Sequence, residues 1–162
     1  MCGIAGIISL QPDLVSAEKL KRMTDALRHR GPDGEGSWVN ESLTAGFGHR
    51  RLAIIDITDS GKQPMHYLGR YTIIHNGEIY NYIELKEELI KKGYRFQSQS
   101  DTEVILAAYD LYKEECLQYF DGMFAFAVWD EKEQSLFAAR DRFGEKPFYY
   151  HFDGVSFSFA SE

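Results

Sequence analysis

The sequence MCGIAGI (residues 1–7) opens the chain and places Cys2 directly before a run of small and β-branched residues. The run from Gly3 to Leu10 has the composition of a strand, so we expect the fold to be built outward from an N-terminal strand. Position 2 gives the cysteine one special property, because removal of Met1 would leave a thiol and a free α-amino group on the same residue. An α-amino group has a pKa of about 7.7 to 8 and can accept a proton at neutral pH. Cys2 would then carry both a nucleophile and a base, although a small buried apolar role is the plain alternative.

Length and composition indicate a globular protein with one core. The chain has 162 residues, of which 44% are hydrophobic and 14% aromatic, enough for a single well-filled domain. The net charge of −7 and the scattered basic residues argue against a nucleic-acid partner. The longest apolar run, Met123 to Trp129, is too short to cross a membrane, and a signal peptide is not recognisable, so we expect no membrane association and a cytoplasmic location. Cys2 and Cys116 suggest neither a disulfide framework nor a cysteine-rich metal site, and Cys116 is expected to be structural.

Hydrophobic spacing and end signals predict three helices. The first covers residues 16–29, because Leu20, Met23 and Leu27 fall on one face. The second covers residues 79–92 and ends before Gly93, which suits a left-handed cap. The third begins at SDTE (residues 100–103), where Ser and Glu have the spacing of a capping box.

The remaining segments are predicted to be strands and loops. RGPDGEG (residues 30–36) is expected to be an irregular loop. Strands are predicted at 37–40, 43–49, 52–55 and 71–75, and in the C-terminal third at 123–130, 135–142, 147–152 and 155–161. Asp153 and Gly154 form a hairpin signal between the last two. Many antiparallel strands with a few helices indicate sheets packed together with helices outside.

Seven motifs carry a resemblance to a known family: MCGIAG, RHRGPDG, HRRLAIID, NGEIYNY, SDTEVIL, DGMFAFAVWD and ARDRFGEKPFYY. Together they resemble the N-terminal glutaminase domain of glutamine-dependent asparagine synthetases, a class II glutamine amidotransferase of the N-terminal nucleophile hydrolase family. The resemblance spans residues 1–162. It implies an α+β fold, a four-layer α-β-β-α sandwich of two antiparallel sheets flanked by helices. The family's C-terminal ATP-dependent synthetase domain has no counterpart in this sequence, which also lacks a phosphate-binding loop of the GxxxxGK[ST] kind.

The resemblance also implies roles for individual residues. Cys2 would attack the side-chain amide of glutamine and form a γ-glutamyl thioester, with its own α-amino group as base, so activity would require removal of Met1. The Asn76 side chain and the Gly77 backbone N–H would form the oxyanion hole. Arg51 would bind the α-carboxylate of glutamine and Asp101 its α-ammonium. The substrate-binding set implied by the resemblance is Arg51, Leu52, Ile54, Ile55, Asn76, Gly77, Glu78 and Asp101.

Each assignment has a simpler alternative. Asp101 could merely stabilise the positive end of the third helix. Asn76-Gly77 could be an ordinary hairpin turn, and Arg51 could be a surface cation. For the whole chain, the alternatives are a non-catalytic glutamine-binding or regulatory domain of the same fold and a Cys-His hydrolase with an internal base.

The expected partners are L-glutamine and a synthetase domain or subunit. Homo-oligomer formation is left open. Glutamine hydrolysis is expected to need no cofactor, whereas ATP and Mg²⁺ would serve only the missing synthetase domain. No metal site is predicted, because no two histidines have the i, i+4 spacing of a helical ligand pair and neither HExxH nor CxxC occurs.

Overall fold

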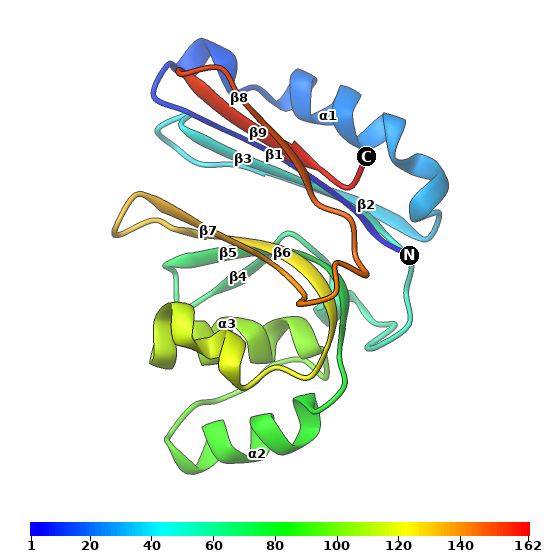
Figure 1. Ribbon diagram of the computed structural model, residues 1–162, viewed down its shortest axis with the longest axis vertical. Helices are drawn as coiled ribbons and strands as arrows, with labels where there is room; N and C mark the ends of the chain where they lie inside the picture. The colour runs from blue at the N-terminus through cyan, green and yellow to red at the C-terminus, as the bar shows by residue number, and fades with distance from the viewer.

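Two antiparallel sheets are stacked face to face in the computed structural model, which describes the backbone of residues 1–162 and every side chain except that of Pro12 (Figure 1). The first sheet has the order β2-β3-β1-β9-β8, from Gly3–Ser9 (β1), Gly34–Val39 (β2), Ala45–Arg51 (β3), Tyr149–Phe152 (β8) and Ser156–Ala160 (β9). The second has the order β4-β5-β6-β7, from Met65–Tyr67 (β4), Tyr71–Ile79 (β5), Gly122–Asp130 (β6) and Ser135–Arg140 (β7).

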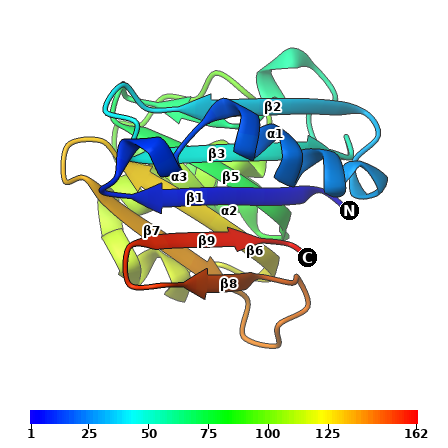
Figure 2. The same cartoon turned by 90° about the horizontal axis from the view of Figure 1, so that it is seen from above.

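Helices cover both outer faces of the stacked sheets. Helix α1 (Ala17–Ala26) lies on the first sheet, over β1, β2 and β3 (Figure 2). Helix α3 (Asp101–Tyr112) lies on the second sheet, and α2 (Tyr82–Lys91) packs against α3 (Figure 1). Four short 3-10 helices connect these elements: Pro12–Leu14 (η1), Arg28–Arg30 (η2), Asp59–Gly61 (η3) and Lys113–Gln118 (η4). The predicted four-layer α+β sandwich is therefore confirmed.

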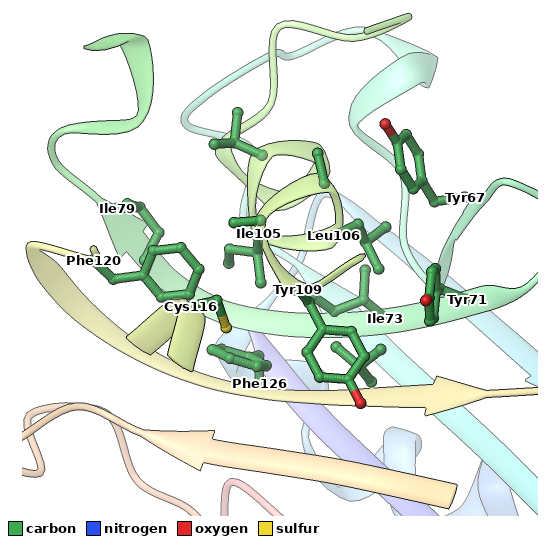
Figure 3. Close-up of a cluster of buried hydrophobic side chains, with 14 of the residues drawn as sticks. Tyr67, Tyr71, Ile73, Ile79, Ile105, Leu106, Tyr109, Cys116, Phe120 and Phe126 are labelled. Carbon is green, nitrogen blue, oxygen red and sulfur yellow. The ribbon is translucent and has the colours of Figure 1, made fainter. Parts of the chain in front are cut away.

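Three apolar clusters fill the spaces between the layers. The largest lies between the second sheet and its helices, where Ile105 and Tyr109 of α3 face Ile73 and Phe126 of the sheet (Figure 3). Cys116 is fully buried in this cluster, and burial raises the pKa of its thiol to about 12, in keeping with a structural role. The second cluster lies between the two sheets, and the third lies under α1.

Several predicted boundaries are wrong, and one predicted strand does not exist. Residues 52–55 form an irregular loop, because this apolar segment lies along a pocket and has no strand beside it. Strand β2 begins at Gly34, inside the predicted loop, and the short strand β4 was not predicted. Strand β5 runs on to Ile79, so the second helix begins at Tyr82 rather than at residue 79.

The helix end signals are confirmed in part. Gly93 has φ +98° and completes a Schellman motif, in which the N–H groups of Gly93 and Tyr94 donate to the carbonyls of Ile90 and Leu89. Ser100 caps α3 by accepting the Thr102 N–H at 3.1 Å. The capping box is not formed, because the carboxylate of Glu103 accepts the backbone N–H groups of residues 97 and 98 instead.

Candidate active site

One pocket gathers every site residue predicted from the sequence. Its walls come from the residue before β1, the end of β3 and the loop after it, the end of β5, and the start of α3. The predicted residues that line it are Cys2, Arg51, Leu52, Ile54, Ile55, Asn76, Gly77, Glu78 and Asp101. Both sheets therefore contribute to the same site.

Cys2 lies at the entry to β1 with its sulfur held against the loop after β3. Its Sγ accepts the Leu52 N–H at 3.4 Å and lies 3.5 Å from the carbonyl of Leu52. Burial raises the pKa of the thiol, while the Leu52 N–H, the charged amino terminus and Arg51 oppose that rise. The Cys2 carbonyl accepts Nε–H of Arg30 at 3.0 Å, so the RHRGPDG segment contacts the backbone of Cys2.

Asn76 and Gly77 lie inside β5, opposite Ala125 and Phe124 of β6. The hairpin-turn alternative for this pair is therefore wrong. Asn76 is buried, and its Nδ2 has no hydrogen-bond partner among the described residues. A buried amide donor without a partner is costly, so this N–H₂ group at the pocket is available to an incoming oxygen.

Gly77 is required by the close approach of β6. A Cβ at this position would collide with the Met123 carbonyl oxygen and would lie 2.6 Å from the Phe124 Cα. Glycine thus lets the backbone beside Asn76 lie directly against the neighbouring strand.

Arg51 is buried rather than a surface cation, since only 9% of it is exposed. Its guanidinium donates to the carbonyls of Thr58 and Asp56, which hold it against the loop that lines the pocket. Arg50, the preceding residue on β3, instead forms ion pairs with Asp25 and Glu35. The alternation of side chains along a strand therefore separates the two arginines, and only Arg51 lines the pocket.

Asp101 is the first residue of α3 and is buried. Its Oδ2 accepts the N–H of Ile79 at 3.0 Å, which ties the start of the helix to the end of β5. A carboxylate in this position also complements the helix dipole, so the helix-stabilising alternative and a substrate-binding role are compatible.

The structure adds a polar network that the sequence reasoning missed. The Gln63 side chain accepts the His75 N–H at 2.5 Å and donates to Thr102 Oγ1 at 3.3 Å. Thr102 Oγ1 also pairs with His75 Nδ1 at 3.2 Å. All three residues line the pocket, and burial lowers the pKa of His75, so its imidazole is neutral near pH 7. This network supports the backbone of β5 directly before Asn76.

Lys146 is a second feature that the sequence reasoning missed. It lines the pocket from the loop between β7 and β8, is only 4% exposed, and its Nζ lies 2.8 Å from the Met1 Sδ. A single lysine in a loop is usually exposed to solvent, so the sequence pattern did not predict that Lys146 would be buried at the pocket.

The described residues hold neither a cluster of metal-ligating side chains nor a helix that could cross a membrane. Within the described residues, no three or more His, Cys, Asp or Glu side chains are grouped so that they could hold a metal ion. Among the described helices, none is both long enough and apolar enough to span a membrane.

Comparisons with known proteins identify the family. A family model described as glutamine amidotransferase domain matches residues 1–162. The chain is 49% identical to asparagine synthetase (glutamine-hydrolyzing) 3 of Bacillus subtilis, with all of this chain and 26% of the relative covered. It is 43% identical to putative asparagine synthetase (glutamine-hydrolyzing) 2 of Methanocaldococcus jannaschii, with all of this chain and 34% of the relative covered. The chain thus spans about a quarter to a third of the length of these relatives.

A solved structure shows the same fold. The glutamine phosphoribosylpyrophosphate amidotransferase of B. subtilis, complexed with ADP and GMP, superimposes with a TM-score of 0.81 over 99% of this chain and 42% of that chain. The sequence identity is 24%, so this likeness concerns the fold alone. From the match over its whole length, the chain belongs to the family of glutamine amidotransferase domains.

Proposed function

We propose that this domain hydrolyses L-glutamine to L-glutamate and ammonia, with Cys2 as the nucleophile. The observation that carries the proposal is the meeting of the Cys2 thiol, the unpaired Asn76 amide, Arg51 and Asp101 in one pocket. In this proposal the active form has lost Met1, because an acylated nitrogen on Cys2 is not a base.

The reaction begins with transfer of the Cys2 thiol proton to the α-amino group of the same residue. The thiolate attacks the side-chain amide carbon of glutamine, and the carbonyl oxygen becomes an oxyanion. Asn76 Nδ2 and the Gly77 N–H would donate to that oxyanion, where a positioned donor lowers the barrier by about 3 to 4 kcal/mol. The ammonium of Cys2 returns its proton to the leaving nitrogen, the C–N bond breaks, and a γ-glutamyl thioester and ammonia form. Water then hydrolyses the thioester to glutamate and restores the thiol.

The rest of the pocket would orient the amino-acid end of the substrate. The planar guanidinium of Arg51 suits a carboxylate, and the Asp101 carboxylate suits an ammonium. The flanks of this subsite would be formed by Leu52, Ile54, Ile55 and Glu78, which line the same pocket. The proposal needs no cofactor for hydrolysis.

The longer relatives suggest a use for the ammonia. Both are named as glutamine-hydrolyzing asparagine synthetases, one of them as putative. We propose that the released ammonia supplies nitrogen for asparagine formation by a synthetase domain or subunit, which would be the part that uses ATP and Mg²⁺.

The test compares ammonia release by processed wild-type protein and by Cys2→Ala after incubation with glutamine. Intact mass first establishes that Met1 has been removed from both. We expect ammonia from the wild type and a loss of at least about 10³-fold in the variant, as for removal of an essential nucleophile. Equal release from both proteins would contradict the proposal.

The alternatives give different results in the same assay. A non-catalytic glutamine-binding domain would bind glutamine without releasing ammonia. A Cys-His hydrolase would be equally active with and without Met1. The buried, unpaired Nε2 of His75 in the pocket is the observation that favours this second alternative, so the unprocessed protein is assayed alongside the processed one.

A further inference from the structure

Lys146 is a buried cation whose ammonium faces the active-site pocket. Only 4% of this residue is exposed, and its Nζ lies 2.8 Å from the Met1 Sδ. Among the described residues, no acidic side chain lies within ion-pair distance of this ammonium. A buried charge without a partner is costly, so its retention points to a use at this site.

The loop that carries Lys146 is held rigidly. The Asp141 carboxylate accepts the Lys146 N–H at 3.0 Å and the Phe124 N–H of β6 at 3.2 Å. The Lys146 carbonyl accepts Nε–H of Arg140 at 2.8 Å. These contacts fix the start of the side chain beside the strand that is paired with Gly77.

Removal of Met1 would change the surroundings of this ammonium. The thioether that it contacts belongs to the residue bonded to the Cys2 nitrogen, and Lys146 and Cys2 line the same pocket. Without Met1, the thioether is gone and the fixed positive charge remains. A neighbouring positive charge disfavours protonation of an amine and favours the thiolate form of a thiol.

We propose that the Lys146 ammonium acts as an electrostatic positioning residue, which keeps the mature Cys2 α-amino group in the free-base form that takes up the thiol proton. The inference deepens the function proposed above and rests on it for the identity of the base. It assigns Lys146 no contact with the substrate.

Some of the other charged groups around the pocket disfavour protonation of the Cys2 α-amine, and others favour it. The cation Arg51 acts in the same sense as Lys146, whereas Glu78 and Asp101 favour a protonated amine. His75 also faces the pocket but is neutral near pH 7, because burial lowers its pKa. The carboxylate of Asp141 is occupied by backbone N–H groups. Arg30, whose Nε–H donates to the Cys2 carbonyl and whose Nη1 pairs with Glu162, also acts in the same sense as Lys146. Loss of the Lys146 charge would remove one of these cations and leave both anions, which shifts the balance toward the protonated amine.

The first test is the pH dependence of kcat/KM for ammonia release by processed Lys146→Met. The acid limb, where the base becomes protonated, is expected to move to higher pH by about one unit. Lys146→Arg keeps a positive charge and is expected to keep the wild-type limb. Lys132→Met is the matched control, since it removes an exposed lysine in the turn after β6. A limb that stays in place in Lys146→Met overturns the inference.

A second test does not depend on glutamine hydrolysis. The rate of Cys2 alkylation by iodoacetamide, measured by peptide mass spectrometry against pH, follows the titration of the thiol and its amine. We expect this profile also to move to higher pH in Lys146→Met and not in Lys146→Arg. Lys146→Gln replaces the methionine variant if circular dichroism shows that the latter does not unfold cooperatively.

The two proposals fail in different ways. If the wild type releases no ammonia, the proposed function is wrong, and the alkylation profiles alone decide the role of Lys146. If the wild type releases ammonia and both profiles of the charge-removing variant coincide with those of wild type, only the inference about Lys146 is wrong.

Discussion

At the scale of single residues, the Asn76 side chain is expected to contribute to the rate of glutamine hydrolysis much more than to the stability of the fold. Its Nδ2 donates to no described group, so truncation breaks no hydrogen bond in the substrate-free protein. We expect Asn76→Ala to lower kcat by about 10²- to 10³-fold, as for removal of one oxyanion donor. The free energy of unfolding should fall far less than this rate effect implies. Ammonia release and urea unfolding measure the two quantities.

Asn40 is a matched control for this prediction. It is also buried, but its amide donates to Ser42 and Thr44 and accepts the N–H groups of Thr44 and Ala45. Asn40→Ala should therefore cost about 1 to 3 kcal/mol of stability and leave kcat unchanged. If Asn76→Ala kept full activity, the Asn76 amide would not be part of the oxyanion hole.

At the scale of elements, the loop between β7 and β8 depends on Asp141. Its carboxylate accepts four backbone N–H groups, from Phe124, Phe143, Glu145 and Lys146. Burial acts to raise the pKa of Asp141, but these donors outweigh it and the pKa lies below its usual value. We expect Asp141→Asn to cost about 1 to 3 kcal/mol at pH 7, because an amide N–H₂ would face backbone donors.

The lowered pKa gives this prediction a pH dependence. The stability that the carboxylate contributes is fully present above its unfolded pKa of about 3.9 and is lost as the pH falls through the lower folded value. Urea unfolding should therefore show a large difference between wild type and Asp141→Asn at pH 7 and a smaller one at pH 3. Asp121→Asn, at an exposed aspartate, should show little difference at either pH. An equal difference at both values would contradict the assignment.

The helices and strands show where sequence patterns predict the structure correctly and where they do not. Helix α3 and the last hairpin were predictable, because their signals are local and agree with the packing. The strand predicted at 52–55 was wrong, since a strand needs a neighbour, which composition does not reveal. Asn76-Gly77 reads locally as a turn, but continuous pairing of β5 with β6 overrides that preference. Cys2 was predicted from its place after Met1, and the other eight site positions came from the family resemblance. The burial of Lys146, whose backbone N–H donates to Asp141, was not predicted.

At the scale of the molecule, the site requires the two sheets to keep their relative position. Arg51 lies on the first sheet, and Cys2 directly precedes β1 of that sheet. Asn76 and Gly77 lie on the second sheet. One buried polar contact crosses between them, from Nε2 of His49 on β3 to the carbonyl of His75 on β5 at 3.3 Å. That carbonyl belongs to the residue directly before Asn76, so the contact links both halves of the site.

The burial of His49 predicts acid sensitivity of the whole fold. Burial lowers the pKa of His49 to about 3 despite the opposing hydrogen bond to the His75 carbonyl, with smaller lowering effects from the His75 imidazole and Arg51. An unfolded histidine has a pKa of about 6.5. The unfolded chain therefore binds more protons below pH 6.5, and stability must fall as the pH falls through this range. From pH 7 to pH 5, His49 alone should cost about 2 kcal/mol, and His75, whose pKa is also lowered, adds in the same direction.

His49→Gln tests this prediction, because an amide N–H₂ can still donate to the His75 carbonyl but does not titrate. Urea unfolding at pH 7 and pH 5 should show that the variant loses less stability than wild type on acidification, by about 2 kcal/mol. His151→Gln, at an exposed histidine on β8, should behave like wild type. If His49→Gln and wild type lose the same stability between these two values, then His49 is not neutral between the sheets, and another group must account for any acid sensitivity.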